Sequence, residues 1–210
     1  MNEFEQALTN YFSPEQLAKI QKTKVGIAGC GGLGSNIAVC LVRSGFKDFE
    51  LMDFDVVETK NLNRQYYFLD EVGLPKVDAL TARLLKINPD LKIKKVNAKL
   101  SIENIISYFK DRDIVFEAFD NIPSKKLIME TWGNTEKLLI FGCGMAGIAN
   151  QPEIKIKKIK NNIYMVGDGT TCVGPENPPL APRVSVCAGL MASIALERVK
   201  FLNISDDIVI

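Results

Sequence analysis

Three glycines with the spacing G-x-G-x-x-G directly follow a short apolar stretch near the N-terminus. They are Gly29, Gly31 and Gly34, and residues 24–28 precede them. Where a strand runs into a helix through such a turn, the missing side chains let backbone amides and the helix N-terminus approach phosphate oxygens. Asp53, nineteen residues after Gly34, ends the next apolar stretch, where a carboxylate can accept hydrogen bonds from a ribose. The spacing favours a nucleotide site over a tight turn that serves packing alone.

Two cations and one more acidic residue fall in loops that should meet at one edge of a sheet. Arg64 and Lys76 follow the second predicted strand, and Asp120 and Asn121 end a later one. Ligands of open α/β sheets bind outside the carboxyl ends of the strands, so two cations there suit a triphosphate. Asp120 is a candidate ligand for Mg²⁺ held by phosphates, although it could equally cap the next helix. The alternative for Arg64 and Lys76 is a solvated surface pair.

Histidine is absent from the sequence, and this limits the chemistry. The commonest general base, the Ser-His-Asp and Cys-His arrangements and the HExxH metal site all require it. Five cysteines, at positions 30, 40, 143, 172 and 187, form no C-x-x-C pair, which argues against a zinc ribbon or a thioredoxin-type motif. Their odd number is typical of reduced thiols inside a cell.

The composition is that of an ordinary folded chain. Its 210 residues are 47% hydrophobic and 24% charged, and the formal net charge is +1. This balance provides no global electrostatic field that would attract nucleic acid or an anionic membrane. The first residues do not resemble a signal peptide, and no stretch reaches eighteen uninterrupted apolar residues, so we expect a soluble, cytoplasmic protein.

Helix and strand signals alternate along most of the chain. We expect strands at 24–28, 49–52, 93–98, 114–118 and 138–142, and helices from the glycine turn to about 44 and at 76–87, 101–109, 121–132 and 184–202. This order predicts an α/β fold with a Rossmann-like, mostly parallel sheet that carries helices on both faces. Residues 153–160 and 163–166 have the alternation of an antiparallel pair of strands near the C-terminal end.

The first 22 residues are expected to form a short helical arm. Two helices are predicted within 4–22, and the second opens at Ser13 with proline next and Gln16 three residues after the cap. Residues 23–210 are expected to form a single nucleotide-binding domain.

Together these motifs resemble the ThiF/MoeB-like adenylyltransferases, relatives of the ubiquitin-activating enzymes. The resemblance rests on GCGGLGS at 29–35, DFDVV at 53–57, NLNRQ at 61–65, the Pro75-Lys76 pair and FDN at 119–121. The short chain looks closest to compact ThiF-type members. That implies adenylation, with ATP and Mg²⁺, of the C-terminal Gly-Gly carboxylate of a ubiquitin-like sulfur carrier such as ThiS, in thiamine thiazole synthesis. It also implies a homodimer.

The resemblance assigns roles to particular residues. Asp53 would bind the ribose, and Asp120 would serve the metal. Asn61, Arg64 and Lys76 would serve the phosphates. The implied catalytic residues are Arg64, Lys76 and Asp120, with Cys172 as a further candidate. The implied nucleotide-binding set is Gly29, Gly31, Gly32, Gly34, Asp53, Asp55, Asn61, Arg64, Lys76 and Asn121.

Three features depart from or complicate this family pattern. Many relatives carry an arginine near the N-terminus that reaches the partner's site, whereas the first arginine here is Arg43, so that role is vacant or passes to a lysine such as Lys22. Many relatives bind zinc through two C-x-x-C pairs, and neither pair exists here, so we expect no zinc site. Cys172, in the flexible-looking loop 167–172, is the candidate thiol for sulfur transfer, while Cys187 and Cys40 suit packing. Cys30 lies inside the glycine turn, and Cys143 could line the site without reacting.

Other functions remain open at this stage. The carrier could be of the molybdopterin type or another sulfur carrier. An NAD- or FAD-dependent oxidoreductase would share the glycine turn and Asp53 but gives no reason for Arg64 and Lys76 together. A non-catalytic nucleotide-binding module would explain the missing N-terminal arginine.

Overall fold

The described residues, 1–148 and 151–200 of a computed structural model, are organised around one seven-stranded sheet. The strand order is β3-β2-β1-β4-β5-β7-β6, and every neighbouring pair is parallel except β6 and β7. The strands are β1 (Lys24–Ala28), β2 (Asp48–Met52), β3 (Lys92–Val96), β4 (Ile114–Glu117), β5 (Leu138–Gly142), β6 (Lys155–Lys160) and β7 (Ile163–Gly167). The predicted mostly parallel sheet with an antiparallel pair near the C-terminal end is confirmed.

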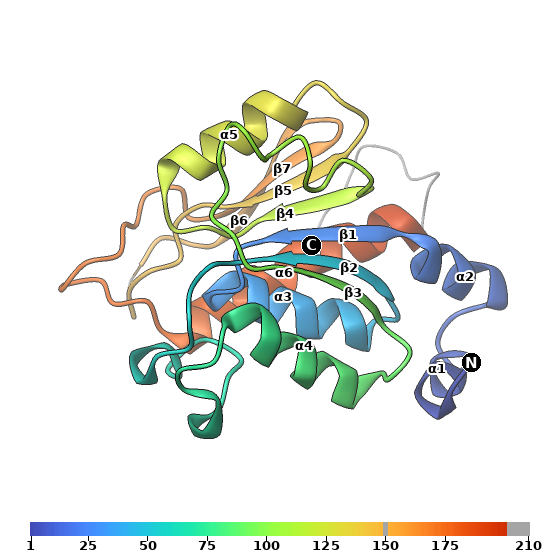
Figure 1. Cartoon of the computed structure of the whole chain (residues 1–210). Coiled ribbons are helices and arrows are strands. Elements are labelled where there is room, and N and C mark those ends of the chain that lie inside the picture. Colours follow the sequence, from blue (N-terminus) through green and yellow to red (C-terminus); the bar gives the residue numbers. More distant parts are fainter. Residues whose placement is uncertain (149–150, 201–210) are drawn as a thin grey trace.

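Helices cover both faces of this sheet, as predicted (Figure 1). α3 (Gly32–Arg43), α4 (Lys76–Ile87) and α6 (Ala181–Lys200) lie on one face, and α5 (Ile122–Trp132) lies on the other. Two short 3₁₀ helices, η1 (Thr59–Asn61) and η2 (Leu69–Glu71), interrupt the connection from β2 to α4. Among the described residues, no helix is both long and apolar enough to cross a lipid bilayer.

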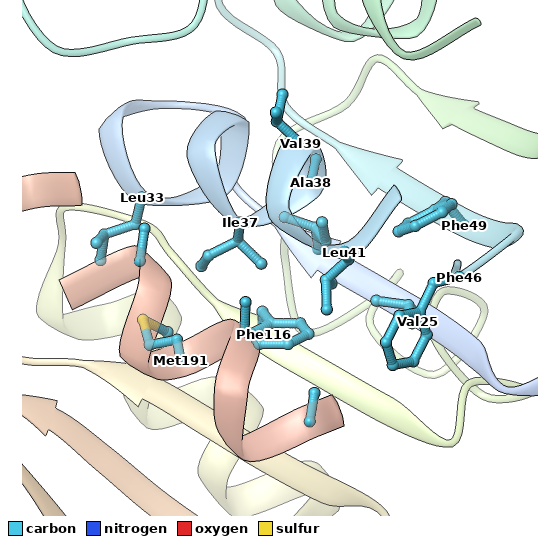
Figure 2. Packing of buried hydrophobic residues seen from close by; sticks show 14 of the residues in the cluster. Val25, Leu33, Ile37, Ala38, Val39, Leu41, Phe46, Phe49, Phe116 and Met191 are labelled. Atoms are coloured by element: carbon cyan, nitrogen blue, oxygen red, sulfur yellow. The ribbon is translucent and has the colours of Figure 1, made fainter. Parts of the chain in front are cut away.

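The larger core lies between the sheet and the pair α3 and α6. Leu33, Ile37 and Leu41 project from α3 toward Met191 of α6 and Phe116 of β4 (Figure 2). Because α3 is enclosed by the sheet and by α6, its sequence is apolar over most of its circumference. This packing fixes the N-terminal end of α3, where the glycine turn stands.

The N-terminal arm forms the two expected helices, α1 (Glu3–Leu8) and α2 (Pro14–Lys22). The Ser13 hydroxyl oxygen accepts a hydrogen bond from the Gln16 amide, and the Ser13 amide donates one to the Gln16 side-chain oxygen, so the predicted capping box is present. Buried Glu5 pairs with Lys47 at 2.6 Å, which attaches the arm to the sheet domain. The domain boundary at residue 22 stays a prediction, and residues 201–210 lie outside the described part.

The predicted helix at 101–109 is wrong. Residues 101–111 form separate turns, and Phe109 adopts a left-handed backbone with φ 57°. The amide of Phe109 donates to the buried Glu50 carboxylate at 3.3 Å, and its ring packs so closely on β1 that a Cβ on Gly26 would lie 2.5 Å from it. These tertiary contacts outweigh the local helix propensity.

The last helix also differs from its prediction. α6 begins at Ala181, three residues before the expected start at Val184, and the predicted end at Leu202 lies outside the described residues. Proline is well tolerated in a first helical turn, so Pro182 opens α6 instead of preceding it.

Candidate nucleotide site

The glycine turn joins β1 to α3 in a conformation that side chains would prevent. Gly29 has φ 101°, and a Cβ there would lie 2.9 Å from the backbone of Ala118, the residue that follows β4. A Cβ on Gly34 would lie 1.8 Å from the carbonyl oxygen of Gly29. The two glycines therefore allow the first turn of α3 to fold back tightly against the end of β1, with its amides at the carboxyl edge of the sheet.

Asp53 follows β2 and is hydrogen-bonded to the glycine turn. Its carboxylate accepts hydrogen bonds from the amides of Cys30 at 2.7 Å and Asp55 at 2.9 Å. Burial raises the pKa of Asp53, against the lowering effects of the Asp55 amide, the Lys76 charge and the Cys30 amide. The predicted spacing between the turn and this acid thus corresponds to direct contact, although both carboxylate oxygens already serve backbone amides.

Lys76, the first residue of α4, is brought to the same edge. Its ammonium pairs with the Asp55 carboxylate at 2.7 Å, and its side chain is only 6% exposed, whereas that of Asp55 is 51% exposed. The Lys76 amide also donates to the Asp55 carbonyl at 2.9 Å. Asp55 therefore orients Lys76, a duty that the sequence did not reveal.

The segment Asn61–Tyr67 wraps around the start of α3. The Asn36 side chain donates to the carbonyls of Gly32 at 2.7 Å and Arg64 at 2.9 Å, and the Tyr67 hydroxyl donates to the Cys30 carbonyl at 2.8 Å. Asn61 is buried and accepts a hydrogen bond from the Glu58 amide at 3.0 Å. These bonds attach the NLNRQ segment to the glycine turn.

Arg64 lies beside the glycine turn, and the charge of Asp120 acts on it. The stem of Arg64 lies beside Gly32, where a Cβ would be 3.5 Å from the Arg64 Cγ. Burial lowers the pKa of Arg64, and the charge of Asp120 opposes that shift. Asn121 caps α5 by accepting the Ser124 amide at 2.9 Å, so the capping duty considered for Asp120 falls to its neighbour.

The expected site residues thus meet at the carboxyl ends of β1, β2 and β4, at the left of Figure 1. The residues expected from the sequence that lie at this edge are Gly29, Gly31, Gly32, Gly34, Asp53, Asp55, Asn61, Arg64, Lys76, Asp120 and Asn121. Lys22, in contrast, ends α2 at the opposite, amino edge of the sheet, so it does not reach its own chain's site.

One residue near the glycine turn was not assigned a role from the sequence. Gln65 is buried, its Oε1 atom has no hydrogen-bond partner within the described chain, and a Cβ on Gly31 would lie 3.8 Å from its Nε2 atom. A buried, unpaired polar atom beside backbone amides is a suitable contact for a polar ligand. Its place in NLNRQ was the available signal.

Comparison with known proteins agrees with this geometry. Residues 5–203 match the ThiF family. The chain belongs to that family. The matched residues include the sheet, the glycine turn and the described part of α6.

Curated relatives of this ThiF-family chain are named as adenylyltransferases. It is 28% identical over 172 residues to the sulfur carrier protein adenylyltransferase of Thermus thermophilus, covering 79% of this chain and 60% of that protein. It is 32% identical over 128 residues to the molybdopterin-synthase adenylyltransferase of Haemophilus influenzae, covering 60% and 53%. The chain therefore spans little more than half the length of these relatives.

Solved structures share the fold. The ATP complex of E. coli tRNA N6-threonylcarbamoyladenosine dehydratase, TcdA, has a TM-score of 0.81 at 24% identity and covers 94% of this chain and 93% of that one. The E. coli MccB structure with ATP has a TM-score of 0.72 at 22% identity and covers 95% and 64%. At these identities the likeness establishes the fold of the ThiF-family chain.

The cysteines of this ThiF-family chain differ in accessibility. Cys172 is exposed, whereas Cys30 and Cys187 are buried, and burial raises the pKa of Cys187 to about 12. The turn before Cys172 is tightly held. Asp168, whose side chain is fully buried, pairs with Arg183 of α6 at 2.6 Å and accepts the Thr171 amide at 2.7 Å.

Metal binding has limited support from protein side chains alone. Within the described residues, no group of three or more histidine, cysteine, aspartate or glutamate side chains is arranged to hold a metal ion. Mg²⁺ usually takes one or two carboxylates and completes its coordination with water and substrate phosphates. The exposed Asp120 carboxylate fits a metal that arrives with a nucleotide.

Proposed function

We propose that this chain is an ATP-dependent adenylyltransferase that activates the C-terminal carboxylate of a ubiquitin-like sulfur carrier protein. The observation that carries the proposal is the convergence of Asp53, Arg64, Lys76 and Asp120 on the glycine turn at one sheet edge. A turn for the nucleotide, two cations and a free carboxylate form a site suited to a metal-bound triphosphate. A dinucleotide site needs neither the cation pair nor Asp120.

The chemistry agrees with the absence of histidine. A terminal carboxylate has a pKa of about 3.5 and is already ionised at neutral pH, so its attack requires no general base. One carboxylate oxygen forms a bond to the α-phosphorus of ATP, and the bond from that phosphorus to the β-bridging oxygen breaks. The products are the acyl-adenylate and pyrophosphate. The protein must supply alignment and neutralise charge on the phosphates.

The proposed division of labour follows the geometry. The glycine turn and Asp53 bind the ribose and the phosphates, Asn61 supports the same segment, and Arg64 and Lys76 neutralise phosphate charge. Asp120 would ligate Mg²⁺, which shields the triphosphate when bound. Cys172 is proposed to act only after adenylation, in sulfur transfer, because its exposure permits access to a partner.

The carrier is proposed to be ThiS-like, in thiamine thiazole synthesis. The names of the relatives support a sulfur carrier, because they include sulfur carrier protein, molybdopterin-synthase and SAMP-activating enzymes. Their range keeps molybdopterin-type carriers as the competing substrate. We further propose a cytoplasmic homodimer that uses neither nucleic acid nor membrane as a partner.

Intact-mass spectrometry of the carrier tests the activity directly. A ThiS-like carrier incubated with the protein, ATP and Mg²⁺ and then quenched in acid should gain the mass of one adenylyl group, which is AMP less one water. The matched control is the same carrier without its terminal glycine, which should stay unmodified. A carrier that stays unmodified when its tail is intact, under conditions where the protein binds ATP, would contradict the proposal and favour a nucleotide-binding module.

A further inference from the structure

An ion pair between a buried carboxylate and a partly exposed ammonium lies next to the turn that carries Asp120. Glu117, the last residue of β4, has a fully buried side chain, and its Oε1 atom accepts the amide of Phe119 at 2.9 Å. Its other oxygen pairs with the ammonium of Lys125 from α5. The same ammonium donates to the Phe119 carbonyl at 2.9 Å. Both peptide groups that flank Phe119 are therefore held by one charged pair.

This arrangement determines how Asp120 is presented. Asp120 is the next residue, it is exposed, and its carboxylate makes no hydrogen bond or ion pair with the described residues. The backbone of the turn therefore sets the direction in which the Asp120 side chain leaves the chain, and the charge of Arg64 acts on its carboxylate. On one side the turn is held by Glu117 and Lys125, and on the other by Asn121 as the cap of α5.

A role in stability alone is a weaker explanation for the pair. Removing the Glu117 carboxylate, and part of the Lys125 side chain, from water costs about as much free energy as their attraction returns, so the pair adds little net stability. Burial raises the pKa of Glu117 to about 7, against the lowering effect of Lys125, which reflects that cost. The geometry that the pair imposes on Phe119 remains as its specific effect.

Lys125 is badly placed to be a further phosphate ligand. Its ammonium already serves Glu117 and the Phe119 carbonyl, and its side chain lines an apolar groove of about 360 Å³ together with Ile122, Met129 and Phe141. A lysine that contacts phosphate directly would strengthen ATP binding with or without a metal. A lysine that acts through Asp120 would affect only the binding that depends on metal.

We propose that Glu117 and Lys125 are positioning residues that hold the Phe119 peptide groups so that the Asp120 carboxylate faces the metal-bound phosphates. This inference rests on the proposed ATP site, and it assigns the pair no contact with substrate. The pair acts on the direction of Asp120, and through it on the affinity for Mg²⁺-bound ATP.

Calorimetric titration with ATP, in Mg²⁺ and in EDTA, tests the inference. Glu117→Met and Lys125→Met should each reduce at least tenfold the factor by which Mg²⁺ raises the affinity for ATP. The affinity for ATP in EDTA should stay within twofold of wild type. Glu117→Gln, which keeps an acceptor for the Phe119 amide, should lie between Glu117→Met and wild type. Lys126→Met, at an exposed neighbour on the same helix, is the matched control and should behave as wild type.

A double-mutant comparison and amide exchange complete the test. Glu117→Met added to Asp120→Asn should weaken Mg²⁺-ATP binding no further than Asp120→Asn alone, because both act through one carboxylate. Amide hydrogen exchange at residues 118–121 should accelerate in Glu117→Met, and this readout requires no ATP. Wild-type Mg²⁺ dependence in Glu117→Met, or an equal loss with and without Mg²⁺, would overturn the inference. If wild type bound no ATP while the exchange result held, the proposed function alone would fail.

Discussion

Lys76 is the residue on which the proposed charge neutralisation depends most. Its side chain is buried and held by Asp55, so it presents one fixed positive charge beside Asp53. We expect Lys76→Met to lower pyrophosphate exchange by about 10²–10³-fold, the size of effect seen when a preorganised stabilising group is removed. The fold should survive because the half-exposed Asp55 carboxylate remains hydrated. Exchange kinetics combined with thermal unfolding measure both effects.

The matched control is Lys86→Met, which removes an exposed lysine near the other end of the same helix. That variant should exchange at the wild-type rate. Wild-type exchange in Lys76→Met would show that the buried ammonium is a structural partner of Asp55 and nothing more.

At the residue scale the sequence predicted which residues lie together at this edge of the sheet better than the bonds between them. Asp53, Arg64 and Lys76 could be found because their spacing follows a glycine turn. The pairing of Asp55 with Lys76 and the orphaned oxygen of Gln65 could not be found, because burial and unpaired atoms exist only after the chain has folded.

The glycine turn is the element whose geometry can be tested most sharply. Glycine to alanine usually stabilises a helix by up to about 1 kcal/mol. At Gly34 the sign should reverse, because the new Cβ would overlap the Gly29 carbonyl oxygen at 1.8 Å. We expect Gly34→Ala to lose about 1–3 kcal/mol of stability and most of its ATP affinity. Urea unfolding and calorimetry measure the two losses.

Gly189 of α6 provides the control for this substitution. A Cβ there meets nothing within 4 Å, so Gly189→Ala should stabilise the protein slightly and bind ATP normally. Equal stability changes at the two positions would mean that the close approach of Gly34 to Gly29 does not constrain the turn.

The loop before Cys172 should depend on pH through Asp168. Burial raises the pKa of this carboxyl, but hydrogen bonds from Thr171 and Thr170 outweigh it and lower the pKa to about 2 from the ordinary 3.8. A lowered pKa means that the stabilisation is present above about pH 4 and is lost as the pH falls toward 2. Asp168→Asn should lower the free energy of unfolding by about 2 kcal/mol at pH 7. The variant should also lose less stability than wild type as the pH falls below about 4.

Urea titrations between pH 7 and pH 2.5 measure this effect, with the exposed Asp90→Asn as the control. If Asp168→Asn lost as much stability as wild type on acidification, the role assigned to Asp168 would be contradicted.

At the element scale the prediction succeeded where local pattern and tertiary contact agreed. The helix at 76–87 and the strand at 138–142 match α4 and β5 in both bounds. The helix at 101–109 failed because the contacts of Phe109 with Glu50 and Gly26 involve residues more than 50 positions away, which no local pattern contains.

At the scale of the whole molecule, the connection from β2 to α4 presents an apolar surface. It projects at the lower left of Figure 1, and 54–57 pairs with 72–75. Its exposed apolar side chains are Phe54, Val56, Phe68, Leu69, Val72 and Leu74. We expect a second copy of the chain to cover these side chains, since exposed apolar residues gathered on one connection commonly mark an interface.

Sedimentation at micromolar concentration should therefore give a dimer for wild type and a monomer for Leu69→Lys. Ile106→Lys, at an exposed isoleucine outside this surface, should remain dimeric. A monomeric wild type would remove the homodimer from the account.

Pyrophosphate exchange into ATP, with a panel of carrier proteins, tests the central claim most directly. We predict exchange with a carrier that ends in Gly-Gly, strongest for a ThiS-like protein, and none with its copy lacking the terminal glycine. Cys172→Ala should exchange at the wild-type rate, because adenylation uses no thiol. No exchange with any carrier, although the protein binds ATP, would contradict the account and leave a nucleotide-binding module in its place.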